Sequence, residues 1–231
     1  MLVDSPRLSD ADRDAWAIME AGDIRRSRSG RVDYLAAESA QHVREFIAAG
    51  CAYVSVSWGK DSVVVAHLAR SVAPGLYLVH GEFPGHENPD SAAVADEFLG
   101  GWPMPYSEIE CQWTDPTTRH VQTDRWARPM RDAHGPRRIM GIRAQESGTR
   151  KMSAGVHGIA TSNVCRPILN WSTLDVFAYL ARHDLPVHPA YAMSRGGTID
   201  RESLRVDVIG DVHGAERGRA DWERHYYPDV G

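Results

Sequence analysis

The feature that most constrains this chain is an apolar strand that runs through a short glycine turn into an apolar helix. Residues 52–57 read AYVSVS, residues 58–62 read WGKDS, and residues 63–69 read VVVAHLA. The β-branched run predicts a buried strand, and the apolar run after the turn predicts a helix packed against it. Units of this kind build parallel sheets, in which ligands bind beyond the carboxyl ends of the strands.

The alternation of strands and helices continues along the chain. Strands are predicted at residues 52–57, 76–80, 106–110, 138–142 and 164–168, and helices at residues 61–71, 89–99, 116–130 and 172–183. Because strands joined by helices must run parallel, this pattern predicts an α/β fold. We expect a single-domain, twisted parallel sheet with helices on both faces.

We divide the 231 residues into three regions. Residues 1–50 are predicted to form an N-terminal helical extension, with helices at 8–21 and 32–49, that caps the sheet or forms a homodimer contact. Residues 51–193 are predicted to form the α/β domain that contains the glycine turn. Residues 194–231 are rich in Gly, Arg and Asp and weakly periodic, which predicts an irregular C-terminal tail or lid.

Composition excludes several classes of protein. Hydrophobic residues make up 42% and charged residues 25%, and no apolar stretch approaches the roughly 20 residues that span a bilayer. The polar, acidic start is unlike a signal peptide, so we expect a cytoplasmic protein with no membrane partner. Cys51, Cys111 and Cys165 lie far apart without CxxC spacing, which argues against disulfides, zinc and an iron–sulfur cluster.

The charge is distributed unevenly. Residues 119–151 carry nine Lys/Arg against three Asp/Glu, a local charge of +6 within a chain whose net charge is −5. A cationic patch in an acidic protein favours a phosphate-rich small ligand, and nucleic acid remains open as a second partner. Only two of the 26 basic residues are lysines, Lys60 and Lys151. Each is therefore a candidate for a role that arginine cannot fill, with chance as the alternative.

The glycine turn has the chemistry of an anion site. Gly59 allows N–H groups to turn inward, Ser57 and Ser62 supply hydroxyl donors, and Lys60 adds a mobile cation. The helix that follows directs its positive end at the turn. A pyrophosphate group would satisfy all of these donors, whereas the alternative is an ordinary helix start capped by Asp61 and Ser62.

The sequence SVSWGKDS resembles the PP-loop signature, S-x-G-G/K-x-D-S, of the ATP pyrophosphatase and phosphoadenosine phosphosulfate (PAPS) reductase superfamily. The resemblance implies an adenine nucleotide alpha hydrolase-like fold. It also implies that the turn binds ATP or a related adenine nucleotide through Ser57, Trp58, Gly59, Lys60, Asp61 and Ser62.

Two later blocks extend the resemblance to residues 52–191. GIRAQESGTRK, residues 141–151, is similar to the G-x-R-x-x-x-S-x-x-R block of PAPS reductase-like proteins, which implies that Gly141, Arg143 and Arg150 contact the nucleotide. Residues 166–193 resemble the family's P-I-x-x-W-x-x-x-D-V-F-x-Y stretch, through Trp171, Asp175 and others. This last block is predicted to be structural.

One stretch departs from the family pattern. Where the family has D-T-G followed by F-P-E, this chain reads LVHGEFPGHENPD, so the expected acidic residue is displaced. His80 and Glu82 are the nearest candidates for the nucleotide site. Asp61 is the candidate ligand for Mg²⁺, the expected cofactor.

The resemblance implies a nucleotide enzyme, and the cysteines restrict its chemistry. Reductases of this family use a C-terminal cysteine or a four-cysteine cluster, and no cysteine follows Cys165. We therefore expect adenylation of an unknown acceptor with release of pyrophosphate, catalysed by Lys60, Asp61 and Arg143 and leading in one variant to sulfur transfer. The partner is then an acceptor, a nucleic acid or a sulfur donor protein.

Two alternatives are a sulfonucleotide (PAPS) reductase and a non-catalytic nucleotide-binding subunit of a nucleic-acid modification complex. Cys111 is considered as a sulfur carrier at the rim of the site, with a packing role as the alternative. Arg201 and Arg205 are considered as tail residues that close over phosphates, with a solvated helix face as the alternative.

Overall fold

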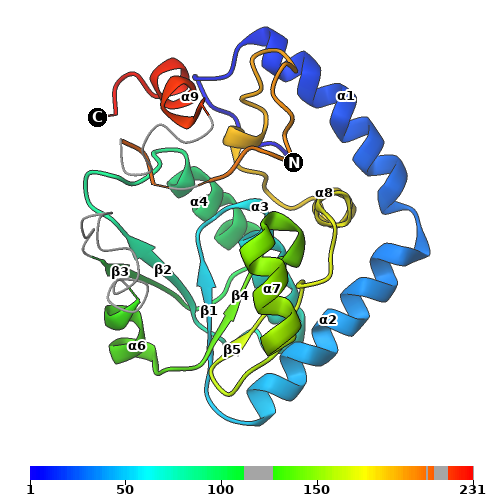
Figure 1. Ribbon diagram of the computed structural model, residues 1–231, viewed down its shortest axis with the longest axis vertical. Coiled ribbons are helices and arrows are strands. Elements are labelled where there is room, and N and C mark those ends of the chain that lie inside the picture. Colours follow the sequence, from blue (N-terminus) through cyan, green and yellow to red (C-terminus); the bar gives the residue numbers. More distant parts are fainter. Residues whose placement is uncertain (112–126, 207, 211–217, 231) are drawn as a thin grey trace.

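Five parallel strands form the centre of the protein in the computed structural model, which describes residues 1–111, 127–206, 208–210 and 218–230 (Figure 1). The strands are β1 (Tyr53–Val56), β2 (Leu78–Glu82), β3 (Tyr106–Glu110), β4 (Arg138–Met140) and β5 (Val164–Cys165). Each overlaps a predicted strand. Their order is β3-β2-β1-β4-β5, and every neighbouring pair is parallel, which confirms the predicted α/β sheet.

The strand order reverses beside β1. The chain adds β2 and β3 on one side of β1 and then returns to place β4 and β5 on the other side. Tyr53 pairs with Arg138 and Ser55 with Met140, so β1 and β4 end together at the carboxyl edge. A crevice for ligands forms at such a reversal, because the connections after the two strands diverge to opposite sides.

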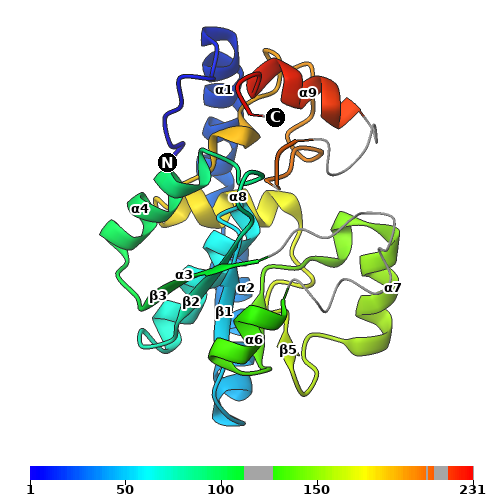
Figure 2. The ribbon, with the colours of Figure 1, turned by 90° about the vertical axis from the view of Figure 1, so that its left-hand side faces the viewer.

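Helices cover both faces of the sheet. The first face is covered by α3 (Lys60–Val72), α4 (Ser91–Gly101) and α8 (Thr173–Arg182), three helices that the sequence predicted to within a few residues. The second face carries α6 (Arg128–His134) and α7 (Gly148–His157). Figure 2 shows α6 and α7 on one side of the sheet and α3 and α4 on the other.

The helix predicted at residues 116–130 can be compared with the structure only at its C-terminal end. Residues 116–126 of the helix expected at 116–130 lie outside the described residues, and α6 continues beyond 130 to His134. Gly135, at φ +86°, follows the last helical residue and stops the helix there. Within the described part of the chain, no helix combines the length and apolar character that crossing a membrane requires.

The N-terminal region consists of α1 (Asp10–Ser27) and α2 (Gly30–Ala48). Ser9 and Asp12 form a capping box that starts α1. Trp16 on α1 packs edge-on against Phe177 on α8, with ring centroids 5.9 Å apart. The apolar stripe of α2, including Val43 and Phe46, is buried in the main core. The homodimer contact and the three-region division stay predictions.

The C-terminal tail contains one helix that the sequence analysis did not predict, α9 (Arg219–Tyr226). The periodic signal is weak because only Trp222 and Tyr226 of its eight residues are buried. The indole N–H of Trp222 donates to the carbonyl of Met193 at 2.8 Å, and the hydroxyl of Tyr226 donates to Asp12 at 3.1 Å. The tail therefore belongs to the same core as α1.

Candidate functional site

The predicted anion turn lies between β1 and α3, at the carboxyl edge of the sheet. The hydroxyl of Ser62 donates to the carbonyl of Gly59 at 2.9 Å and accepts from the N–H of Ser57 at 3.3 Å. Trp58 has φ +56°, a left-handed conformation that is uncommon for a residue with a large side chain. The Ser62 hydroxyl thus shapes the turn, and the backbone at Trp58 is held in a strained conformation.

Three N–H groups of the turn are available to a ligand. Within the residues that the structure describes, the N–H groups of Trp58, Gly59 and Asp61 have no hydrogen-bond partner. They lie at the start of α3, where the helix dipole adds positive potential. The side chain of Trp58 is buried against Phe98 and Tyr106, so Trp58 can contribute only its backbone.

Gly59 is required for close packing. Its φ of −76° is ordinary, but a Cβ at this position would lie 3.0 Å from the hydroxyl of Tyr191. That hydroxyl accepts a hydrogen bond from the N–H of Lys60 at 3.2 Å. Tyr191 lies in the short helix η3 (Pro189–Tyr191), and the sequence analysis had assigned its block only a structural role. The structure places it directly beneath the turn.

Lys60 is buried under the turn, with only 4% of the residue exposed. Its ammonium lies 3.0 Å from Oδ2 of Asp61 and 4.7 Å from the ring centroid of Tyr191. Burial alone lowers the pKa of the ammonium, but Tyr191 and Asp61 more than offset this, so the pKa of Lys60 is raised above its ordinary value. Lys60 therefore remains a cation inside the protein.

Arg143 reaches the same carboxylate from the other side of the reversal point. Its Nε donates to Oδ1 of Asp61 at 2.6 Å, and its Nη1 donates to Oγ1 of Thr173 at 3.1 Å. Arg143 is only 2% exposed. One buried carboxylate is thus shared by two buried cations, which leaves one positive charge in excess at the start of α3. An anionic ligand would neutralise this charge.

Gly141 allows the loop after β4 to pack against the start of α3. A Cβ at Gly141 would lie 2.6 Å from the backbone carbonyl group of Asp61. Any residue other than glycine would clash there, because only glycine lacks a Cβ. The residue that the family resemblance implied as a nucleotide contact therefore has a packing role, because it lets β4 approach the start of α3. Arg143, two residues later, gains its position from this approach.

Glu146 ties the loop after β4 together. It lies in the short helix η2 (Ala144–Glu146), accepts from the N–H of Arg143 at 3.0 Å and forms an ion pair with Arg150. Arg205 from the tail donates to the carbonyl of Glu146 at 3.0 Å. Arg150 lies near the loop that carries Arg143, and its guanidinium already has an anionic partner there.

His80 lies at the carboxyl end of β2, as predicted, and both of its ring nitrogens are engaged. Nδ1 lies 3.0 Å from the carbonyl oxygen of Val56, and Nε2 lies 3.1 Å from Oε1 of Glu87. Burial lowers the pKa of this imidazole, but the hydrogen bonds to Glu87 and Val56 outweigh burial and raise the pKa overall. The carbonyl of Val56 and the carboxylate of Glu87 are both acceptors, and an imidazolium, with a proton on each ring nitrogen, can donate to both.

Glu87 is the acidic residue of this stretch that the sequence analysis missed. Besides His80, its carboxylate accepts from the N–H of Phe83 at 3.2 Å. The family pattern placed an acid directly after Phe83-Pro84, and Glu87 lies two positions beyond that point, so a search of the whole loop would have found it. Glu82 ends β2 and is half-buried.

The tail passes over the turn as a strap, which we define as residues 204–206 and 208–210. A Cβ at Gly59 would lie 3.4 Å from Cβ of Val206. Farther along the strap, the N–H of Ile209 donates to the carbonyl of His86 at 2.7 Å. The strap thus runs from the loop after β4 across the turn to the loop after β2. The lid role of this tail stays a prediction.

Arg201 corrects one interpretation of the tail. Its guanidinium forms two hydrogen bonds with Asp23 on α1, at 2.6 and 2.7 Å, and lies 4.0 Å above the ring of Phe177. Both charged side chains are buried. Arg201 is therefore a structural anchor and does not close over phosphates.

The cysteines are also placed away from the rim. Cys111 is fully buried against Gly81 and Met130, and burial raises the pKa of its thiol. Cys165 is buried, and burial raises the pKa of this thiol to about 12. Cys51 is exposed before β1, at the opposite edge of the sheet. The rim role considered for Cys111 is therefore wrong, because the side chain fills the core.

The chain is similar to known proteins in sequence and in fold. Residues 104–216 match the sequence model of the phosphoadenosine phosphosulfate reductase domain. A phosphoadenosine 5'-phosphosulfate reductase of Synechococcus is 26% identical over 187 residues, which cover 73% of this chain and 76% of that protein.

Two solved structures share the fold. PAPS reductase from Candida auris, in a phosphate complex, superposes with a TM-score of 0.50 and 12% identity, covering 68% of this chain and 88% of that one. The U34-tRNA thiolase of Methanococcus maripaludis superposes with a TM-score of 0.51 and 10% sequence identity, and the match covers 86% of this chain and 76% of that one. The domain match and the relatives confirm the resemblance seen in the sequence. Over residues 104–216 the chain matches the PAPS reductase domain, and in sequence it is similar to PAPS reductases over about three quarters of its length.

Proposed function

We propose that the protein binds ATP or a closely related adenine nucleotide at the turn of residues 57–62 and breaks its α–β phosphate linkage. The observation that supports this most directly is the buried cation pair, Lys60 and Arg143, which shares one carboxylate at the start of α3. The unpaired N–H groups of the turn add donors to the same place. A polyphosphate supplies both the charge and the acceptor oxygens that this arrangement lacks.

In the proposed reaction an acceptor oxygen attacks the α-phosphorus. The new bond joins that oxygen to the adenylyl group, the bond from the α-phosphorus to the bridging oxygen breaks, and its electron pair leaves with pyrophosphate. The acceptor hydroxyl proton passes to water. Lys60 and the N–H groups of the turn stabilise the charge on the pyrophosphate, and Arg143 stabilises the charge on the α-phosphate, so catalysis rests on position and electrostatics.

Asp61 serves as the partner that orients these cations. Both of its oxygens face a positive group, Lys60 at 3.0 Å and Arg143 at 2.6 Å, so the residues around it do not fit a magnesium ion held by the protein. The described residues contain no group of three His, Cys, Asp or Glu that could hold a metal. Mg²⁺ commonly enters such sites on the phosphates of a nucleotide. The magnesium requirement stays part of the proposal.

The adenylated acceptor is an activated group that a sulfur donor can attack. Since Cys111 and Cys165 are buried, the sulfur for such a step would come from a separate donor protein. A non-catalytic nucleotide-binding subunit remains the competing hypothesis. It predicts tight binding of ATP without release of pyrophosphate.

Nucleotide binding should raise the melting temperature. At a free ATP concentration one hundred times the dissociation constant, the free energy of unfolding should rise by about 2.7 kcal/mol. Thermal shift measurements with ATP and Mg²⁺ test this, and product identification with pyrophosphate detection then tests turnover. If no adenine nucleotide stabilises the protein at millimolar concentration, the nucleotide site has been assigned incorrectly.

The second candidate function is PAPS reduction, which the names of the curated relatives favour. We expect the purified protein to release no sulfite from PAPS or adenosine phosphosulfate when thioredoxin or glutaredoxin is supplied. The reason is that Cys111 and Cys165 are buried and Cys51 lies at the opposite edge of the sheet. Sulfite formation that disappears when one cysteine is replaced would identify that thiol as a reductase nucleophile and overturn this expectation.

A further inference from the structure

The second face of the sheet carries two arginines that the proposed reaction does not use. Arg138 begins β4 and pairs with Tyr53 of β1 and Val164 of β5, so all three lie on the face of the sheet that α6 covers. Arg166 directly follows β5 and lies close enough to Arg138 for the two charges to interact. Each of the two arginines is half-buried.

The polar atoms of this cluster are enclosed without partners. Nε and Nη1 of Arg138 and the hydroxyl of Tyr53 are buried and have no hydrogen-bond partner among the described residues. Among the described residues, the guanidinium of Arg166 donates one hydrogen bond, to the carbonyl of Gly158 at a long 3.4 Å. Burial and the charge of Arg138 lower the pKa of the Arg166 guanidinium. Two close cations without a carboxylate are unfavourable unless an anion joins them.

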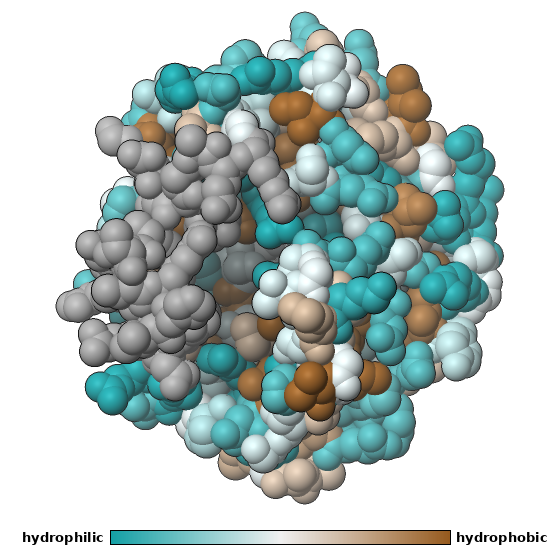
Figure 3. Space-filling model, in the orientation of Figure 1, coloured by the Kyte–Doolittle hydropathy of each residue, from teal (hydrophilic) through white to brown (hydrophobic). Residues whose placement is uncertain are grey.

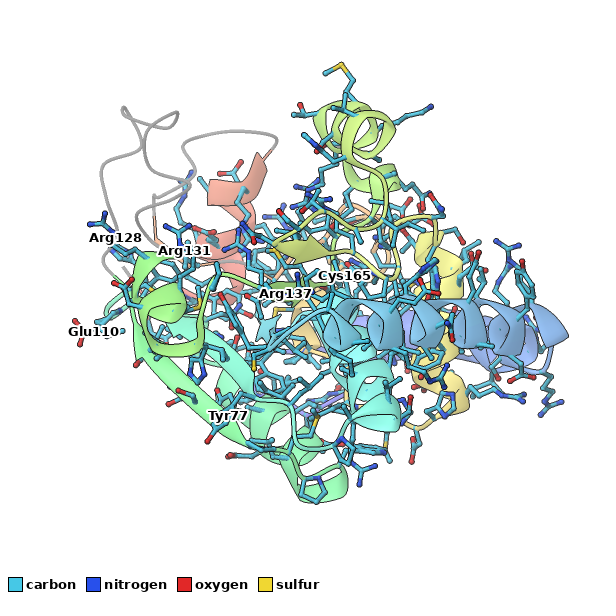
Figure 4. All side chains as sticks on the ribbon, turned by 90° about the horizontal axis from the view of Figure 1, so that it is seen from below. Tyr77, Glu110, Arg128, Arg131, Arg137 and Cys165 are labelled. Atoms are coloured by element: carbon cyan, nitrogen blue, oxygen red, sulfur yellow. The ribbon has the colours of Figure 1, made fainter. Side chains whose placement is uncertain are left out.

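Further positive charge surrounds this cluster. Residues 127–166 carry eight Lys/Arg against two Asp/Glu, while the whole chain has a net charge of −5. Arg128 and Arg131 stand on α6, and Figure 4 shows them on the same side of the sheet as α7. Lys151 and Met152 on α7 are exposed. A surface with such an excess of positive charge attracts an extended anion.

The mixture of side chains on this side favours a nucleic acid over a single ion. In Figure 3, which shows this side, apolar side chains are scattered among hydrophilic ones. Met152 is 69% exposed and Val156 77% exposed on α7, one helical turn apart. Basic side chains beside exposed apolar ones match a nucleic acid, which presents phosphates together with bases.

We propose that this side of the sheet binds the phosphate backbone of a nucleic acid, with Arg138 and Arg166 holding one phosphate and Lys151 and Arg128 contacting others. The inference rests on the proposed function and names the class of its acceptor. Arg138 lies three residues before Gly141 on the strand that leads to Arg143, roughly 10 Å from the nucleotide turn. A bound strand would therefore pass close to the adenylyl group.

The test is fluorescence anisotropy without ATP or Mg²⁺, so its outcome is independent of the nucleotide site. The probes are labelled single-stranded RNA, single-stranded DNA and duplex DNA, titrated over a range of salt concentrations. We expect binding that weakens as salt rises. Each phosphate contact removed by Arg166→Gln or Lys151→Gln should lower the salt slope by about 0.7 and the affinity about fivefold at 0.1 M salt for a single strand.

The control is Arg44→Gln, which makes the same charge change at an exposed position on α2. It should bind the probes as the wild type does. Arg138→Met separates binding from folding, because it removes a cation whose enclosed atoms have no partner. This variant should melt no lower than the wild type and still bind at least fivefold more weakly.

Three outcomes would overturn the proposal. The first is wild-type affinity in both Arg138→Met and Arg166→Gln. The second is an equal loss in Arg44→Gln, which would mean that only net charge matters. The third is stabilisation of the protein by inorganic phosphate, lost in Arg138→Met, with no oligonucleotide bound, which would assign the cluster to a free oxyanion.

Discussion

Replacing Lys60 with arginine should leave the protein folded and remove most of its activity. The ammonium of Lys60 is enclosed between Asp61, at 3.0 Å, and the ring of Tyr191, at 4.7 Å. A planar guanidinium is broader and would displace the carboxylate, the ring or the phosphate. The loss of one well-placed charge contact in a dry site corresponds to about 2.7 to 4 kcal/mol, or roughly a hundred- to a thousandfold in rate.

The measurement is release of pyrophosphate by Lys60→Arg, Lys60→Ala and a control, Lys151→Arg. Lys151 is exposed, so exchanging one cation for another there should leave the rate nearly unchanged. Lys60→Arg should lose almost as much activity as Lys60→Ala. Near wild-type turnover of Lys60→Arg would show that charge alone is required at this position and would contradict the geometric argument.

Replacing Asp23 with alanine should destabilise the whole protein. Asp23 and Arg201 form two hydrogen bonds at 2.7 and 2.6 Å, and both side chains are buried. Removing the carboxylate leaves the guanidinium of Arg201 buried without an anionic partner. Breaking a buried pair in this way costs about 3 to 5 kcal/mol of unfolding free energy. Denaturant unfolding of the purified variant measures the loss.

The exposed pair of Asp221 and Arg224, at 2.7 Å, provides the matched control. Its side chains are 68% and 77% exposed, so Asp221→Ala should change the unfolding free energy by less than about 1 kcal/mol. The double variant Asp23→Leu with Arg201→Met should recover much of the stability, because neither charge then remains buried. Equal losses in Asp23→Ala and Asp221→Ala would contradict a role for burial.

The strands and the nucleotide turn were predictable because their signals are local. A β-branched run before Ser57 and an apolar helix after Ser62 determine the strand, the turn and the direction of the helix dipole within some fifteen residues of sequence. The expected strands at 106–110 and 138–142 were found at β3 and β4 for the same reason. By contrast, α9 was missed, since eight residues with two buried positions produce little periodicity.

The partners of the site residues were less predictable. The sequence marked His80 and Glu82, but Glu87 forms the contact with His80 because the loop after β2 folds back on itself. Arg201 was considered for phosphates and instead binds Asp23 on a helix that precedes it by 178 positions. Cys111 directly follows β3, and it is buried in a cluster with Met130, which lies on α6, a helix that begins only at Arg128. Such contacts leave no periodic trace.

The sequence by itself determined an α/β sheet, a glycine turn that presents donors to an anion, and a lysine where arginine is otherwise the usual cation. These properties follow from local backbone preferences and from the chemistry of single side chains. Only the tertiary structure decided that Asp61 joins Lys60 to Arg143, 82 positions away, and that Arg138 and Arg166 have no carboxylate partner in the part of the chain that the structure describes. The reason is that the energy of a charge depends on its burial and on its neighbours in space, and packing alone sets both.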